Sequence, residues 1–306
     1  MNVDAMHLAQ VFNSSLRLMT PILFVALGSA FCVRVRIFNI GLEGMMLTGA
    51  FFAIVANHFT GSIMLSLSAA MVSSMLVAWL AGIFMVKFKG AMLVVGIAIN
   101  ILMGALTTFL MQLIFNVRGA FVSPYLVGLP RFELGFLERF PLIHTMFAGL
   151  TPLDIFAFVA AVLLYIVLFK TVLGFRIRSV GINKEAAESL GIRAESIQIR
   201  TVLFSGLLSG LGGALLVMGG VTMFAQNVTA GRGFIALAAG NMGAAHPIGV
   251  IASSAFFGFA QGFANILQNS PSISSELTLM TPYLATIIAL ALYNYMNIKR
   301  GREVGV

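Results

Sequence analysis

Residues 170–200 read KTVLGFRIRSVGINKEAAESLGIRAESIQIR and form a charged region in a chain that otherwise avoids charge. Nine of the chain's 18 basic and 10 acidic residues lie here: Lys170, Arg176, Arg178, Lys184, Glu185, Glu188, Arg193, Glu195 and Arg200. Asn183 predicts a helix N-cap, residues 184–190 the helix, and Gly191 its end. A short, polar, well-capped helix in such a region favours contact with a soluble partner, as in a transport subunit driven by a separate motor.

The composition excludes an ordinary soluble domain. Hydrophobic residues make up 59% of the 306 residues and charged residues only 9%, against about 25% charged in a soluble domain. The mean hydropathy is +1.01, so the chain needs lipid as its solvent. The net charge of +8 does not indicate nucleic-acid binding, because the basic residues flank apolar runs, where the positive-inside rule places them.

Apolar runs of about 20 residues predict membrane-spanning helices. The predicted spans are residues 14–33, two within 44–86 joined by a turn at 57–62, then 90–117, 153–169, 201–220, two helical pieces within 233–268 that break near Pro247, and 279–298. A re-entrant segment at 38–49 or 234–245 would change the count. We therefore expect one membrane domain over residues 1–306, all-α and polytopic, with eight to ten transmembrane helices.

The basic clusters predict the orientation of these spans. Arg34 with Arg36, Lys87 with Lys89, residues 170–200 and residues 299–302 are expected on the cytoplasmic side. Alternation of the spans then places residues 118–151 and the N-terminus on the outer side.

Glu43, in the sequence NIGLEGMMLTGA of residues 39–50, is an acidic residue at a membrane boundary. An intramembrane carboxylate costs about 2.5–3.5 kcal/mol or more unless it is paired or hydrated. One interpretation makes Glu43 a gating or conduit residue. The other makes it an interfacial carboxylate that pairs with Arg34 or Arg36 and caps a helix start. The sequence leaves both open.

Neutral polar side chains at membrane depth allow two interpretations as well. These are Asn100, Gln112, Asn241, Gln261 and Asn265. They would bind a neutral polar solute or pair with one another between helices, where polar groups often join membrane helices. The glycine-rich residues 201–220 favour tight helix packing over a backbone-lined path.

Several chemistries have no support in the sequence. Residues 231–236 read GRGFIA and match G-x-G-x-x-A, but that motif needs a βαβ unit, and here it opens an apolar segment. No G-x-x-x-x-G-K-[ST] occurs, and the four histidines are scattered without a metal-binding pattern. We expect no cofactor and no metal.

The helix at 184–190 is either an ordinary solvated helix or a docking helix. Ala186 and Ala187 together suggest a small-residue surface between Lys184 with Glu185 and Glu188. Such a surface suits a shallow groove on a partner, which favours docking.

Three motifs resemble the permease subunits of bacterial ABC importers, in the group that includes ribose, branched-chain amino acid and purine-nucleoside permeases. They are NIGLEG with GAF at residues 39–44 and 49–51, GFRIRSVGINKEAAESLGI at residues 174–192, and GFIALAAG at residues 233–240 with Pro247 and Gly258. The second motif looks like the family's cytoplasmic coupling loop, here about 174–200. The first looks most like the nucleoside branch. The resemblance covers residues 14–298 in the family's order.

The resemblance implies a multi-pass protein of the bacterial plasma membrane with three protein partners: an ABC ATPase subunit, a second permease chain, expected to be a paralogue, and an extracytoplasmic substrate-binding lipoprotein. It implies that the ATPase acts on the coupling helix through Arg178, Gly181, Asn183, Glu185, Ala186, Ala187 and Gly191. Asn39, Glu43, Asn100 and Asn241 are the candidate residues of the translocation path. The chain itself is not expected to be an enzyme.

We therefore expect import of purine or related nucleosides. The same machine importing a simple sugar such as ribose is the alternative. A stand-alone ion-coupled transporter would need ionisable residues inside the membrane, and Glu43 is the only one expected there. A membrane enzyme would need a nucleophile–base or metal constellation, and none is visible.

Overall fold

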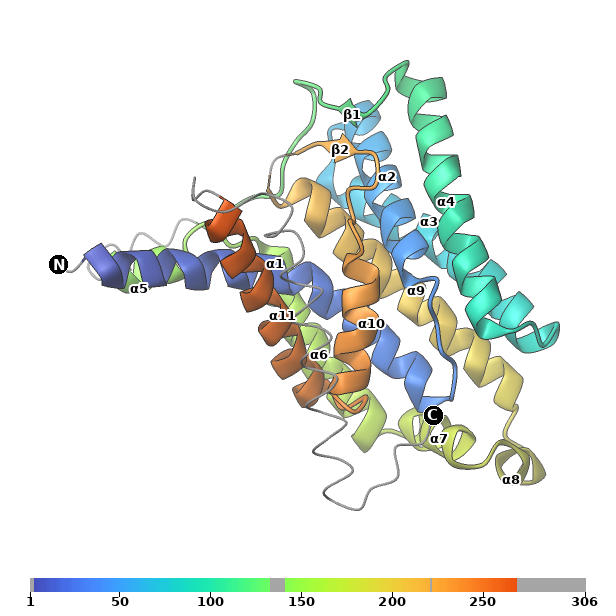
Figure 1. Ribbon diagram of the computed structural model, residues 1–306. Helices are drawn as coiled ribbons and strands as arrows, with labels where there is room; N and C mark the ends of the chain where they lie inside the picture. Colours follow the sequence, from blue (N-terminus) through green and yellow to red (C-terminus); the bar gives the residue numbers. More distant parts are fainter. Residues whose placement is uncertain (1–2, 133–140, 221, 269–306) are drawn as a thin grey trace.

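The computed structural model describes residues 3–132, 141–220 and 222–268. Over these ranges the chain forms a helical bundle with one short two-stranded ribbon (Figure 1). The helices are α1 (Val3–Arg34), α2 (Leu42–Thr60), α3 (Ile63–Gly82), a π-helical turn η1 (Ile83–Lys87), α4 (Met92–Phe115), α5 (Pro141–Phe147), α6 (Pro152–Lys170), α7 (Val172–Ile182), α8 (Lys184–Ser189), α9 (Ala194–Met218), α10 (Arg232–Met242) and α11 (Pro247–Gln268). Strand β1 (Ala120–Phe121) pairs antiparallel with β2 (Phe224–Ala225).

Within the described ranges, seven helices are long and apolar enough to cross a membrane, namely α1, α2, α3 with η1, α4, α6, α9 and α11. The all-α polytopic fold is thereby confirmed. The predicted turn after α2 is present, because Gly61 ends that helix with φ of +61°. The predicted break before Pro247 separates α10 from α11. The predicted span 279–298 and the basic residues 299–302 lie outside the described residues.

Helix α9 is the central packing helix of the described bundle, because it contacts α1, α2 and α3. A methyl group on Gly210 would overlap the carbonyl oxygen of Ala70 in α3, and one on Gly213 would overlap that of Met46 in α2. Glycine at these positions lets the helix backbones touch, which is how membrane helices gain packing energy. The packing interpretation of the glycine-rich span is therefore confirmed.

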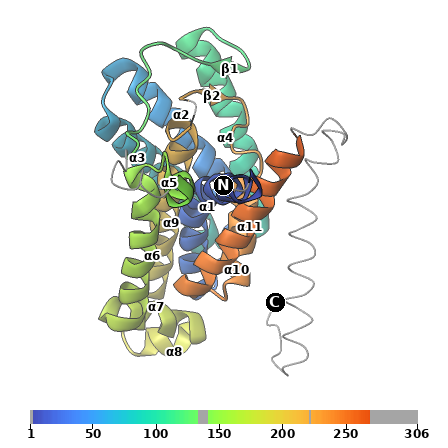
Figure 2. The same cartoon turned by 90° about the vertical axis from the view of Figure 1, so that its left-hand side faces the viewer.

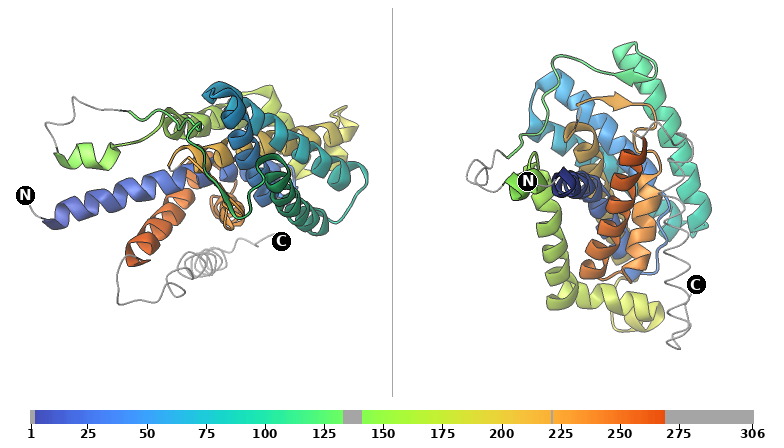
Figure 3. Two further views of the ribbon diagram at one scale, coloured as in Figure 1. Left: turned by 90° about the horizontal axis from the view of Figure 1, so that it is seen from above. Right: turned by 60° about the vertical axis from the view of Figure 1, so that its left-hand side comes forward.

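Helix α1 extends beyond the bundle at its N-terminal end, where it lies beside α5 (Figure 3). The Asn13 amide nitrogen donates to the carbonyl oxygens of Met146 and Ala148, at 3.1 and 2.8 Å. This polar contact ties the outer part of α1 to the segment that leads into α6.

The charged region 170–200 contains more helix than the sequence predicted. The sequence predicted only α8, yet α7 precedes it, and residues 194–200 are the first turns of α9 instead of a loop. Gly174, Ile177 and Val180 form the buried side of α7. The arginines between them concealed this pattern. Helices α7 and α8 lie at one end of the bundle and the β1–β2 ribbon at the other (Figures 1 and 2).

The basic clusters that the structure describes gather at the end that carries α7 and α8. A methyl group on Gly181 of α7 would overlap the carbonyl oxygen of Arg34 at the end of α1. Lys87 lines a hollow together with Arg193 and Arg200. This common location agrees with the orientation that the positive-inside rule predicts, with this end in the cytoplasm.

Candidate functional site

The connection between α1 and α2, residues 35–41, is non-helical and largely buried. Unpaired backbone N–H and C=O groups in this connection and in the first turn of α2 would be costly in an apolar environment unless other groups satisfy them. The Asn100 amide on α4 does so twice: its nitrogen donates to the Ile40 carbonyl at 3.0 Å, and its oxygen accepts from the Gly44 backbone at 2.8 Å. Asn39 accepts from the Gly41 backbone at 3.1 Å and donates to the Ser205 hydroxyl at 3.0 Å.

Glu43 lies in the first turn of α2, and its carboxylate caps the N-terminus of another helix, α10. Oε1 accepts from the Thr229 hydroxyl at 2.6 Å and from the Gly231 backbone at 2.9 Å. Oε2 accepts from the Gly233 backbone at 2.6 Å. Glycine is required at 233, since a methyl group there would lie 2.5 Å from the Glu43 Cα. A negative charge at two helix N-termini is favourable, because unsatisfied N–H groups concentrate there.

Arg34 acts at the opposite end of α10. Its Nε donates to the Ala245 carbonyl at 2.9 Å and its Nη2 to the Ala244 carbonyl at 3.4 Å, directly after the helix. The interpretation in which Glu43 pairs with Arg34 or Arg36 differs from these contacts, because the carboxylate accepts from Thr229, Gly231 and Gly233 instead, although a helix start is indeed capped. The two side chains hold the two ends of α10, each with the charge that its end of the helix dipole prefers. We call Arg34, Glu43 and α10 together the α10 clamp.

The four predicted path residues do not form one cluster of free side chains. Asn39 and Glu43 are buried and engaged in the contacts above, while Asn100 is partly buried beside them. Asn241 lies on α10 and donates to the Leu237 carbonyl of its own helix at 2.8 Å. Of the two interpretations given to the amides, the contacts of Asn100 match the pairing of helices, and Asn39 makes a contact of the same kind with Ser205.

The predicted docking helix α8 has the expected caps. The Asn183 side chain accepts from the Ala186 backbone at 3.0 Å, and Gly191 has φ of +80°. The expectation that Ala186 and Ala187 share one exposed surface is wrong, because Ala187 is only 3% exposed. Ala186 and Glu185 are exposed, and the flanking Ile182 and Leu190 are 76% and 81% exposed. An apolar surface that includes Ala186 therefore faces away from the bundle.

Arg178 and Gly181 connect this loop to the bundle and do not form its outer surface. The guanidinium of Arg178 lies 5.3 Å from the centre of the Phe169 ring, and that of Arg34 lies 5.6 Å from the same ring. Gly181 lies against the Arg34 backbone, as described above. The end of α7 is thus in direct contact with the residue that holds the C-terminal end of α10.

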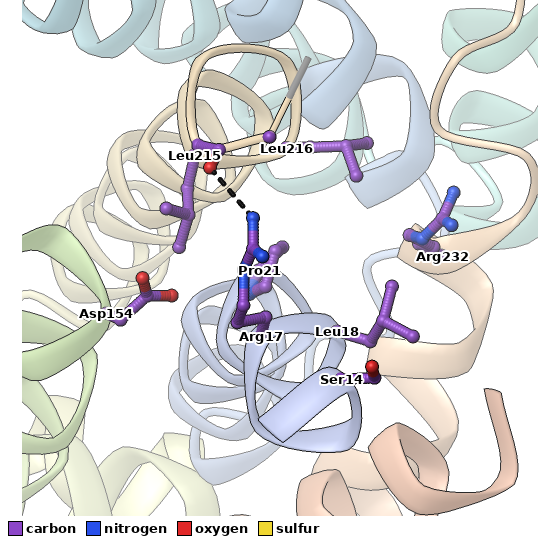
Figure 4. Close-up of a pocket in the computed structure, with 10 residues that line it drawn as sticks. Ser14, Arg17, Leu18, Pro21, Asp154, Leu215, Leu216 and Arg232 are labelled. Carbon is purple, nitrogen blue, oxygen red and sulfur yellow. Dashed lines mark hydrogen bonds between the residues drawn. The ribbon is translucent and has the colours of Figure 1, made fainter. Parts of the chain in front are cut away.

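A polar cavity of about 240 Å³ lies between α1, α6, α9 and α10. Figure 4 shows Arg17 of α1 between Asp154 of α6 and Arg232 of α10, with its Nη2 donating to the Gly219 carbonyl at 3.2 Å. Asp154 is only 3% exposed and accepts from the Thr20 hydroxyl and from the Thr151 hydroxyl and backbone.

Asp154 is thus a buried acidic residue in the first turn of a candidate span, α6, in addition to Glu43. Asp154 escaped notice because it sits at the edge of its predicted span. The signal that locates it is the Thr151-x-x-Asp154 capping box ahead of an apolar run. Among the described residues, no group of three or more histidine, cysteine or acidic side chains is arranged to hold a metal ion.

A family of membrane proteins matches almost the whole chain. The family described as "branched-chain amino acid transport system / permease component" matches residues 11–292. The chain belongs to this family of permeases. It is accordingly a multi-pass protein of the bacterial plasma membrane, in agreement with the seven apolar helices found among the described residues.

Curated relatives of the permease match it over most of their own length. It is 35% identical to the guanosine ABC transporter permease NupQ of Bacillus subtilis, over 88% of this chain and 87% of that one. It is 36% identical to the nucleoside ABC transporter permease NupC of Lactococcus lactis, over 90% and 89%. It is 26% identical to a second permease of that organism, the nucleoside ABC transporter permease NupB, over 94% and 81%.

In this permease the described site therefore consists of two parts that touch. One is the α10 clamp. It joins two places where the helices are interrupted, namely the break between α1 and α2 in the first half of the chain and the break between α10 and α11 in the second half. The other is the loop of α7 and α8, which contacts the clamp through Gly181 and Arg34. Interrupted membrane helices in both halves often mark a transport pathway.

Proposed function

We propose that this permease forms the membrane path of an ABC importer for purine or related nucleosides. The observation that carries the proposal is the sequence identity of 35–36% between this chain and a guanosine and a nucleoside permease, over about nine-tenths of the chain. The same machine carrying a simple sugar such as ribose is the alternative substrate assignment.

The second membrane subunit is a paralogue of this chain. Lactococcus lactis supplies two relatives named as nucleoside permeases, and this chain is 36% identical to one and 26% to the other. This difference supports a heterodimer in which the present chain takes the place of NupC and a NupB-like chain completes the path.

ATP hydrolysis takes place in a separate ATPase subunit that docks on α8. The support is the exposed apolar surface around Ala186, with Ile182 and Leu190 on either side. An extracytoplasmic lipoprotein delivers the substrate at the opposite end of the bundle, where the β1–β2 ribbon lies (Figure 1).

Movement of α8 is transmitted to the helices that line the membrane path through contacts between rigid elements. Gly181 at the end of α7 presses on the Arg34 backbone, and the Arg34 side chain holds the carbonyl groups after α10. Glu43 fixes the other end of α10 to α2. A displacement of the α7–α8 loop would therefore tilt α10 relative to α2, and this tilt opens the path to one side of the membrane at a time.

The path residues have separate roles in this mechanism. Glu43 and Asn39 hold the interrupted helices, because each makes protein contacts and is buried. Asn100 is partly exposed but holds the same interrupted segment, whereas the partly exposed Asn241 offers a neutral amide to a neutral solute. A nucleoside presents hydroxyl and base groups that such amides recognise without a fixed charge.

The test is uptake into proteoliposomes that contain the permease, its ATPase, a NupB-like chain and the binding lipoprotein. Labelled guanosine and labelled ribose are compared, with and without the ATPase. We expect guanosine uptake that depends on the ATPase and on ATP.

Each other outcome contradicts part of the proposal. Uptake of ribose alone would keep the machine and overturn the substrate. Uptake without the ATPase, driven by an ion gradient, would show a secondary transporter and would direct attention to Asp154 and Glu43. A system that works without the paralogue would overturn the heterodimer.

A further inference from the structure

A long apolar groove runs along the outside of the bundle between α3, α6 and α9. Its upper part encloses about 940 Å³ and its lower part about 590 Å³. The two parts are continuous, because Leu164, Val167 and Phe204 line both. Met64 of α3 and Phe156 and Leu163 of α6 are exposed along its walls, at 74%, 40% and 50%. A groove of this composition accepts hydrocarbon and excludes polar solutes.

The lower part of the groove ends at two arginines. Among the described residues, Arg176 of α7 and Arg200 of α9 are the charged residues that line this part, and both are exposed. A smaller adjoining hollow of about 320 Å³ shares these two side chains and adds Arg193. Glu188 and Glu195 line another hollow, which they share with Lys87, Arg193 and Arg200. The mouth of the groove is therefore positive.

Helix α7 places this mouth at the level of the lipid headgroups. Val172, Leu173 and Phe175 of α7 are 69%, 52% and 60% exposed, although the helix lies at the cytoplasmic end of the bundle. Apolar and aromatic side chains beside arginines are typical of helices that lie in the membrane interface. The α6 residues that line the groove run from Pro152 to Val167, which is about 22 Å at about 1.5 Å per residue, against a hydrocarbon core of about 30 Å.

We propose that this groove binds an anionic phospholipid of the cytoplasmic leaflet. One acyl chain lies between α3, α6 and α9, and the phosphate lies between Arg176 and Arg200. Basic pockets between membrane helices on the cytoplasmic side are suited to anionic headgroups, and guanidinium groups bind phosphate oxygens through paired hydrogen bonds. The bound headgroup joins α7 to α9, the two helices that hold α8.

The test measures lipid binding to the assembled transporter by native mass spectrometry. The purified complex is titrated with phosphatidylglycerol and phosphatidylcholine that carry the same acyl chains. We expect tighter binding of phosphatidylglycerol. Replacing both arginines, Arg176→Gln with Arg200→Gln, lowers that affinity about 30-fold, which corresponds to about 1 kcal/mol for each basic residue near the lipid.

Two matched controls distinguish binding at this site from the effect of positive charge elsewhere on the cytoplasmic surface and from the effect of a bulky residue elsewhere on α6. Lys89→Gln with Lys170→Gln removes the same charge from exposed cytoplasmic positions outside the groove and leaves the affinity within about twofold. Val167→Trp fills the groove where its two parts meet and lowers lipid binding. Val159→Trp changes the same residue type on the same helix at a 44% exposed position and leaves binding unchanged.

Three results would overturn the proposal. Equal binding of the two lipids would remove the headgroup preference. An equal loss in the lysine pair would reduce it to diffuse surface charge. Displacement of the lipid by excess inorganic phosphate, together with unchanged binding in Val167→Trp, would show a phosphate site with no role for the groove.

Discussion

Replacing Glu43 by glutamine tests whether the α10 clamp holds the interrupted helices together. The substitution keeps the shape of the side chain and removes its charge. In the native protein the two carboxylate oxygens accept three hydrogen bonds, from the Thr229 hydroxyl and from the backbone of Gly231 and Gly233. A glutamine side chain has one accepting oxygen, so its amino group must face at least one of these donors.

The expected cost follows from these contacts. If the amide oxygen takes the place of Oε1, the Gly233 N–H loses its acceptor, and a buried unsatisfied group costs about 1–3 kcal/mol. Loss of the negative charge at the start of α10 costs a further 1–2 kcal/mol or so in a partly buried setting. Glu43→Gln should therefore destabilise the permease by about 2–5 kcal/mol.

The assay combines equilibrium unfolding in mixed SDS–detergent micelles with ATP-dependent guanosine uptake. We expect Glu43→Gln to lower both the unfolding free energy and the uptake rate. Glu188→Gln makes the same chemical change on an exposed carboxylate of α8 and should alter stability by less than about 0.5 kcal/mol. Thr229→Val removes one of the three donors and should cost about 1.5 kcal/mol.

The double variant decides whether these residues share one site. If Glu43 and Thr229 act through the same contact, Glu43→Gln with Thr229→Val should cost less than the sum of the single changes. Native stability and uptake in Glu43→Gln would refute the clamp and make Glu43 an ordinary interfacial carboxylate.

Three further predictions concern the coupling loop and the core. Ala186→Trp, on the exposed side of α8, should leave the permease folded and abolish ATP-dependent uptake, whereas Ala187→Trp, at a buried position, should lower the yield of folded protein. The yield in size-exclusion chromatography and the uptake rate distinguish the two variants. Normal uptake in Ala186→Trp would contradict docking at this surface. In Gly181→Val the new side chain should overlap the Arg34 carbonyl, which should reduce uptake at least tenfold while the ATPase still co-purifies. Unchanged uptake would contradict a role for the contact between Gly181 and Arg34 in coupling. Gly210→Leu should prevent folding because Ala70 of α3 leaves no space, whereas Gly104→Leu, with nothing within 4 Å of its Cβ position, should be tolerated; equal yields of the two would contradict central packing of α9.

Local sequence signals were sufficient for the long apolar helices and for the caps of α8. Apolar runs located the long helices, because each must cover about the thickness of the bilayer with apolar side chains. Asn183 and Gly191 located α8, because helix caps depend on residues next to the helix. The break before Pro247 followed from a single residue that cannot continue a helix. Helix α7 was missed because its buried positions alternate with arginines.

The tertiary structure alone decided which groups meet. Thr229, Gly231 and Gly233 lie nearly 190 positions after Glu43 in the chain, yet all three donate to its carboxylate. Likewise Ala187 and its neighbour Ala186 have the same side chain, and only the packing of α8 makes one buried and the other exposed. The sequence by itself determined the spans, the caps and the class of machine, since these depend on composition and on neighbouring residues. The pairing of Glu43 with α10 depends on how the helices pack, which no local pattern specifies.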